Sequence, residues 1–105
     1  SFPSPSEAEA IRKVGVHKVM WGNDYPHHEG TFPYNREHLR RSFSDWDEAD
    51  LRTIFTDNAV EVYRFDADAL APLAARIGPS VAEVATPLDK ADIPRDALSP
   101  AFTRP

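Results

Sequence analysis

The sequence predicts a chain of the α/β class that is mostly helical and contains a single strand. One run of β-branched and aromatic residues, 16–21, has the composition of a buried strand. Four or five other stretches carry apolar residues at helical spacing, and no second run of comparable strand quality occurs in the 105 residues. Because a lone strand leaves its backbone N–H and C=O groups unpaired, we expect its partner strands to lie in sequence that is not here.

Helix and strand follow one another at the start of the chain. Ser6 and Glu9 form a predicted capping box, and the short helix that follows should end at Gly15. The predicted strand 16–21 comes next and is closed by Gly22. A helix, a glycine and an apolar strand make up the αβ half of an α/β unit, in which both faces of the strand are covered.

Residues 22–35 form a long predicted loop, because they contain two glycines, two prolines and no periodic pattern. Asn35 should cap a helix that runs to about Ser44. Asp47 and Asp57 open two further predicted helical stretches. Long loops at strand ends are where catalytic and binding residues often lie.

The last third of the chain is predicted to be helical at first and irregular later. Asp68 is a candidate cap for one helix, into which Pro72 fits only if it lies in the first turn. Ser80 opens a further predicted capping box. Prolines then interrupt the chain repeatedly, so we expect the part beyond Pro87 to be extended or turn-rich and to wrap around the rest.

The composition excludes several classes of function. The net charge is −5 and no basic stripe is longer than the Arg40–Arg41 pair, so nucleic acid and anionic membrane are not expected partners. No apolar run approaches the roughly 18 residues that a membrane helix needs. The lack of cysteine removes disulfides and thiolate metal sites and fits the cytoplasm. A first residue that is Ser1 and not Met suggests a processed or truncated chain.

Asp24 and His27 are the candidate functional residues, because they follow the predicted strand directly. A carboxylate at the carboxyl end of a strand can bind a divalent cation or take a proton from water bound to that cation. An Asp-x-Pro string also shapes ordinary turns, so the residues alone leave a turn-capping role for Asp24 open. His27 is the one histidine that we place near Asp24.

Other polar residues are weaker candidates. We expect His17 to pack in the strand with a backbone partner and His38 to face solvent from a helix. The four histidines show none of the familiar metal-ligand spacings, and Ser42 and Ser44 lack the glycines of a nucleophile elbow. Four aromatic residues are expected to be core or interface anchors: Phe32, Phe43, Trp46 and Phe55.

Three strings in a fixed order resemble the amidohydrolase-related family. They are VMWGNDYPH at 19–27, EGTFP at 29–33 and DNAVEVY at 57–63, and the resemblance spans about residues 11–65. This branch of the amidohydrolase superfamily includes aminocarboxymuconate-semialdehyde and resorcylate decarboxylases and many metal-dependent hydrolases. The position of Asn23, where many relatives carry serine, is a departure from the pattern.

The resemblance implies that the run 16–21 is the eighth strand of a (β/α)8 TIM barrel. Asp24 then takes the place of the metal-associated aspartate that follows this strand. His27 falls where relatives often have a histidine, which implies a role in substrate binding or in support of the metal ligands. Asn58 and Tyr63 belong to the helix that closes the barrel, and the resemblance implies a structural role for them.

The family's other metal ligands, a His-x-His pair and single histidines on earlier strands, are not present here. One carboxylate binds a cation feebly, since affinity comes from several ligands in fixed geometry, so we expect the 105 residues to be inactive alone. Residues 1–65 would hold the last barrel strand with its flanking helices. Residues 66–105 would be a carboxy-terminal helical extension with a Pro-rich tail.

The resemblance implies an intact enzyme that uses a divalent metal, zinc first and manganese second, to hydrolyse or decarboxylate a small carbonyl- or carboxylate-bearing substrate. In hydrolysis Asp24 would accept a proton from water on the metal, and in decarboxylation it would help hold the metal. The implied partners are the remainder of the barrel, the substrate and a second copy in a homodimer. Phe102 would be an anchor in an interface or a clasp over the barrel.

An alternative is a free-standing helical interaction module without catalysis. A buried core that accounts for Val16, Val19 and Met20 without partner strands would favour this module. Exposure of these three residues, or their pairing with another copy, would favour a barrel fragment with a strand edge that tends to associate.

Overall fold

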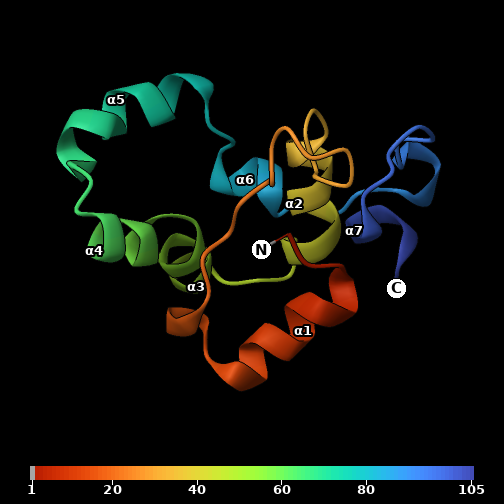
Figure 1. The fold of residues 1–105 in the computed structure, drawn as a ribbon, viewed down its shortest axis with the longest axis horizontal. Coiled ribbons are helices and arrows are strands. Elements are labelled where there is room, and N and C mark those ends of the chain that lie inside the picture. The colour runs from red at the N-terminus through yellow and green to blue at the C-terminus, as the bar shows by residue number, and fades with distance from the viewer. Residues whose placement is uncertain (1) are drawn as a thin grey trace.

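The computed structural model describes residues 2–105 and is built from short helices that surround one irregular segment (Figure 1). Among these residues there is no β-strand. The predominance of helix agrees with the sequence-based expectation. The elements in chain order are α1 (Pro5–Val14), η1 (Val16–Lys18), α2 (Asn35–Phe43), α3 (Glu48–Arg52), η2 (Thr53–Asp57), α4 (Asn58–Tyr63), α5 (Ala67–Ile77), α6 (Val81–Val84), η3 (Lys90–Asp92) and α7 (Pro100–Thr103).

The predicted strand 16–21 is wrong for this chain. Its first half is the 3-10 helix η1, and the chain then runs on without regular structure, with Val19 in an extended conformation. A strand needs a neighbouring strand to pair its backbone. Here helical residues take that place: Asn58 Nδ2 donates to the carbonyl oxygens of Val16 and Val19 at 2.8 and 2.6 Å.

The first helix begins two residues earlier than predicted. Ser4, not Ser6, is the N-cap of α1, and the Glu7 carboxylate accepts the Ser4 backbone N–H at 2.8 Å. Pro5 explains the shift, because a proline at the first helical position lacks only an N–H that would be unpaired there anyway. The predicted end is confirmed, since Gly15 follows the helix with a φ of 110°.

The middle helices follow the prediction with two corrections. α2 ends at Phe43, close to the predicted Ser44, but Tyr34 rather than Asn35 is its N-cap. Asp47 caps α3 as predicted, and its side chain accepts the Asp50 N–H at 2.9 Å. No new start occurs at 57, because the π-helix η2 joins α3 to α4 without a break.

The core lies where α1, α2, α3 and η2 meet, and Phe43 is fully buried at its centre. Trp46 and Phe55 pack edge-on against Phe43, with ring centroids 5.1 Å away in both cases. Phe32 does not join them: it is exposed and packs on Tyr25, so the expectation of a core position is wrong and that of an interface anchor stays a prediction. The buried cluster consists of Ala8, Ile11, Leu39, Phe43, Trp46, Leu51, Ile54 and Val84.

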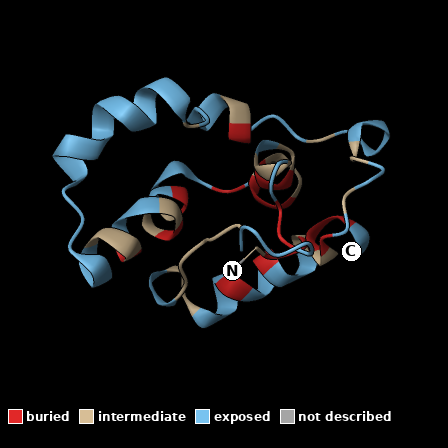
Figure 2. Cartoon of the chain, turned by 45° about the horizontal axis from the view of Figure 1, so that its top comes forward, coloured by how far each residue is buried: buried red, intermediate tan, exposed pale blue. Residues whose placement is uncertain are grey.

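α5 has no buried residue, and Figure 2 shows it exposed along its length. Its cap is Asp66, whose side chain accepts the Ala69 N–H at 3.0 Å, so the prediction of Asp68 was wrong by two residues. Pro72 therefore lies in the second turn and not in the first. Ser80 caps α6 as predicted.

The Pro-rich end folds back onto the first two helices, as expected of a wrapping tail. Arg41 on α2 donates to the carbonyl oxygens of Ala101 and Arg104 at 3.1 and 2.9 Å. Phe102 is buried and packs edge-on against Tyr34. No helix within residues 2–105 has the length and apolar character needed to cross a bilayer. The division at residues 65 and 66 stays a prediction.

Candidate functional site

Asp24 and His27 lie together on the turn that follows the extended segment. His27 Nδ1 is 3.2 Å from Asp24 Oδ2, and the His27 backbone N–H donates to the Asp24 carbonyl oxygen at 2.8 Å. Asp24 has a φ of 60°, a left-handed conformation that aspartate tolerates better than most residues. About half of each side chain is exposed, at 54% and 50%, so the pair faces solvent.

The base of this loop is closed by backbone and side-chain contacts. The Thr31 N–H donates to the Asn23 carbonyl oxygen at 3.0 Å, and the Thr31 hydroxyl donates to Asn35 Oδ1 at 2.8 Å. Gly30 sits so close to the Asn23 and His27 carbonyl oxygens that a Cβ atom would collide with them. The loop that carries Asp24 is therefore closed on itself and tied to the start of α2.

The described residues do not complete a metal site. Asp24 and His27 offer two donors, and the His28 ring lies tilted against the His27 ring, with centroids 4.7 Å apart. Nowhere in residues 2–105 do three or more His, Cys, Asp or Glu side chains converge in a way that would hold a cation. Catalytic zinc sites have three protein ligands, so a metal at Asp24 needs ligands from other chain segments.

His38 is fully buried, which corrects the expectation that it faces solvent. Its Nε2 lies 2.8 Å from the Pro3 carbonyl oxygen, and its Nδ1 lies 3.3 Å from the Trp21 indole nitrogen. Burial lowers the pKa of His38 to about 4, while the Pro3 hydrogen bond acts in the opposite direction. One signal was available in the sequence: His38 shares a helical face with Phe43 and Ser42, at the spacing that α2 buries.

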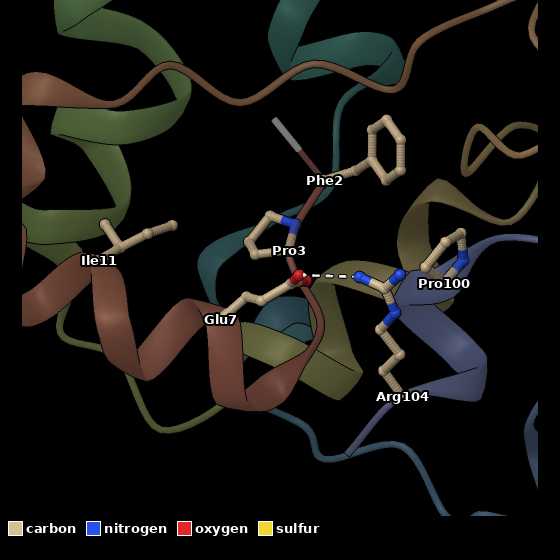
Figure 3. A pocket seen from close by; sticks show the side chains of 6 residues that line it. All are labelled: Phe2, Pro3, Glu7, Ile11, Pro100 and Arg104. Atoms are coloured by element: carbon tan, nitrogen blue, oxygen red, sulfur yellow. Dashed lines mark hydrogen bonds and ion pairs between the residues drawn. The ribbon is translucent and has the colours of Figure 1, made fainter.

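A separate surface hollow of about 380 Å³ lies between the starts of α1 and α7 (Figure 3). Arg104 Nη1 is 3.3 Å from Glu7 Oε1 across it, and both side chains are half exposed. The Ser4 backbone N–H, with help from Arg104, lowers the pKa of Glu7. Asp24 and His27 are not among its lining residues, which are Phe2, Pro3, Glu7, Ile11, Pro100 and Arg104.

Comparison with protein families matches residues 1–65 to a family described as amidohydrolase. Comparison with curated proteins and with solved structures gives no match. The matched residues include the Asp24 loop and the two α2 residues, Asn35 and His38, that bind Thr31 and Trp21 at its ends. They also include Asn58, whose side chain donates to the extended segment. Because 65 of the 105 residues match, the chain belongs to the amidohydrolase family, whose domain is a TIM barrel and whose members are generally metal-dependent.

Proposed function

We propose that this chain supplies the last strand and the metal-associated aspartate of a TIM-barrel enzyme of the amidohydrolase-related branch. One observation carries the proposal. Within the residues that match the family, Asp24 and His27 form a solvent-facing pair directly after the β-favouring run. The intact enzyme would be a metal-dependent hydrolase or decarboxylase that acts on a small carbonyl- or carboxylate-bearing substrate.

The partial burial of the segment 16–21 supports the proposal that it is a barrel strand. Val16 and Val19 are only half buried, although they pack against the core, and Met20 is half buried as well. β-branched residues of this kind favour a pleated sheet surface with neighbours on both sides. In the intact barrel the segment 16–21 would pair with adjacent strands, and the hydrogen bonds from Asn58 would be exchanged or supplemented.

Asp24 is suited to act as a proton acceptor and metal-associated group. One carboxylate oxygen faces His27, and the side chain projects from a left-handed residue in a loop that is closed by contacts at Gly30. His27 is half exposed beside it and would contact the substrate. A bound divalent cation, zinc as the first candidate and manganese as the second, would supply charge stabilisation for either reaction.

The further partners follow from the same proposal. The remainder of the barrel would provide the metal ligands that residues 2–105 lack. Alone, the 105 residues would be inactive, because two donors do not hold a cation in fixed geometry. A homodimer and a cytoplasmic location are further parts of the proposal.

The test uses a longer polypeptide that includes the sequence encoded upstream of Ser1, in which we expect a His-x-His pair. Asp24→Asn in that polypeptide should lower the metal-dependent turnover by about 10²- to 10⁴-fold, the range for loss of a general base. Asp89→Asn is the matched control, because Asp89 is exposed and its side chain makes no cap hydrogen bond. Unchanged turnover in Asp24→Asn, or an unrelated upstream domain, would refute the proposal.

A second candidate is a helical interaction module without catalysis. It is favoured by the core that residues 2–105 form by themselves and by the position of Asp24 outside the hollow in Figure 3. Exposed apolar side chains on and around α4 and α5 would be its contact surface: Val62, Tyr63, Phe65, Leu70, Leu73 and Ile77. A stop codon just upstream, with cooperative unfolding of the 105-residue chain, would support this candidate.

A further inference from the structure

His38 connects three parts of the chain that are far apart in sequence. Its ring stacks on Trp21 with centroids 6.2 Å apart and an interplanar angle of 19°. Phe43 on its own helix and Phe102 on α7 meet the ring edge-on at 6.0 and 6.3 Å. A fully buried imidazole among aromatic rings must have both nitrogens paired, because an unpaired buried polar atom costs free energy.

The two partners of His38 determine where its proton lies. The Pro3 carbonyl oxygen can only accept, so Nε2 must carry the hydrogen. The Trp21 indole N–H can only donate, so Nδ1 must present its lone pair. Both contacts are satisfied together only by the neutral ring that is protonated at Nε2.

The loop that carries Asp24 is held at both ends by one side of α2. At its start, Trp21 is anchored by His38 through the indole N–H and by the Ile54 carbonyl oxygen through its backbone N–H at 3.2 Å. At its end, Thr31 is anchored by Asn35. Asn35 and His38 are three residues apart on a helix and therefore lie on neighbouring positions of the same face.

We propose that His38 is a positioning residue for Asp24: in its neutral, Nε2-protonated form it holds Trp21 and thereby sets the place of the loop relative to α2. The inference rests on the proposed function for the role of Asp24 in catalysis. His38 itself would not touch substrate or metal. Its part is to supply the fixed base on which a carboxylate must sit to act in a defined geometry.

Protonation of the ring would break this arrangement. A proton on Nδ1 would set an N–H against the Trp21 N–H and remove the contact. Arg41 on α2 is a cationic neighbour that disfavours a second charge at this place. The positively charged amino terminus acts in the same direction as Arg41. Trp21, Pro3 and Phe102, which contact the ring, contribute uncharged groups. The anchor should therefore release in acid.

The first experiment is nitrogen-detected NMR of the histidine rings in the 105-residue chain near neutral pH. We expect His38 to show the signals of a neutral ring protonated at Nε2 and to keep them until the pH approaches 4. His17, which is exposed, serves as the reference ring. A His38 ring that is protonated at Nδ1, or that already takes up a second proton well above pH 4, would overturn the proposal.

The second experiment measures what the anchor does to the loop. Trp21→Phe keeps an aromatic ring but removes the donor, and we expect about 2- to 10-fold faster hydrogen exchange at the Thr31 amide together with shifted amide signals of Asp24. Trp46→Phe is the matched control, because Trp46 packs on Phe43 and Arg12 away from this loop. Equal responses in the two variants would overturn the proposal.

Variants of His38 separate positioning from packing. His38→Phe keeps ring packing without either hydrogen bond, while His38→Gln keeps one amide donor and one amide acceptor. We expect the glutamine variant to restore part of the Asp24 signal position that the phenylalanine variant loses. Should His38→Phe fail to fold, Trp21→Phe still answers the question, because it leaves the histidine in place.

The longer polypeptide distinguishes this inference from the proposed function. Trp21→Phe should lower kcat there with little change in KM, because the catalytic group is displaced and substrate binding remains. If Asp24→Asn abolishes turnover while Trp21→Phe leaves kcat and the Asp24 signals unchanged, the positioning role is refuted and the function stands. If Trp21→Phe moves Asp24 but Asp24→Asn leaves turnover intact, the anchor is supported and the catalytic role of Asp24 is refuted.

Discussion

Helices α2 and α5 are similar in length but opposite in their surroundings. α2 has nine residues and buries four of them, including the polar His38 and Ser42, whereas α5 has eleven residues and buries none. α5 is the more apolar of the two, with Leu70, Leu73 and Ile77 exposed. Burial in this chain therefore depends on which segments surround a helix and not on how apolar the helix is.

The neighbours of the two helices explain the difference. α1, α6, α7 and the extended segment all pack on α2. α5 is connected to the rest near its carboxyl end, where Arg36 of α2 donates to the Ile77 carbonyl oxygen at 2.8 Å. The family match ends at residue 65, just before α5 begins at Ala67. The exposed helix thus lies outside the part of the chain that resembles the family.

The largest expected difference between the helices is in the free energy of unfolding lost when one apolar side chain on each is truncated to alanine. Phe43→Ala should lower the free energy of unfolding by about 3–5 kcal/mol, because it empties the centre of the core. Leu73→Ala on α5 should change it by less than about 0.5 kcal/mol. Urea unfolding of both variants makes the measurement. Equal losses would mean that α5 is buried in solution.

Acid should destabilise the α2 region through His38. Its pKa is about 4 in the folded chain and near the ordinary 6.5 in the unfolded chain, so between these values the unfolded state binds more protons. The contribution of His38 to the free energy of unfolding is then fully present above pH 6.5, the pKa in the unfolded chain. It falls by at most about 3 kcal/mol as the pH drops toward 4. Glu7, whose pKa is also lowered, adds a loss in the same direction at lower pH.

Unfolding by urea at several pH values tests this prediction. His38→Gln should flatten the pH dependence between about 6.5 and 4, since an amide does not titrate. His17→Gln, at an exposed position, should retain it. A wild-type chain whose stability is constant over this interval would show that His38 is not buried as a neutral ring.

A smaller and opposite effect is expected at Ser42. Its hydroxyl is buried on α2 and has no hydrogen-bond partner among the described residues. Ser42→Ala should therefore raise the free energy of unfolding by about 1 kcal/mol, since it removes an unsatisfied polar group and favours helix. Calorimetric unfolding measures the change, and Ser80→Ala, which deletes a helix cap, should act in the opposite direction.

The smallest effect on stability is expected when exposed leucines of α5 are replaced by polar residues. Replacement of Leu70 and Leu73 by Gln should leave the free energy of unfolding within about 0.5 kcal/mol of its original value. The same change should reduce any self-association, because it removes exposed apolar surface. Sedimentation velocity over a range of concentrations reports the association. A large loss of stability would show that α5 packs on something in solution.

Local signals in the sequence predicted the helices well and the extended segment poorly. Asp47, Ser80 and Gly15 delimit helices as predicted, because a cap acts on backbone groups within one turn. The caps at Ser6 and Asp68 were each misplaced by two residues, where another polar residue stood close by. The family was predictable from short strings of residues, and the match over 1–65 confirms it.

The conformation of residues 16–21 and the burial of His38 were not predictable from local pattern. Strand pairing requires a partner that the pattern itself does not contain, and Asn58, some 40 residues away, takes its place. His38 became a core residue because Pro3 and Trp21 reach it from distant parts of the chain. That Asp24 and His27 are neighbours was predictable, while their exposure was not.

The sequence by itself therefore determined the helical segments and the pairing of Asp24 with His27, which depend on residues within a few positions of one another. It also determined the family, which depends on three short strings in a fixed order. The tertiary structure alone decided which helix is buried, that His38 is a buried ring with a lowered pKa, and what holds the loop of Asp24. These depend on contacts between segments far apart in the chain, where burial and hydrogen bonding override local preference.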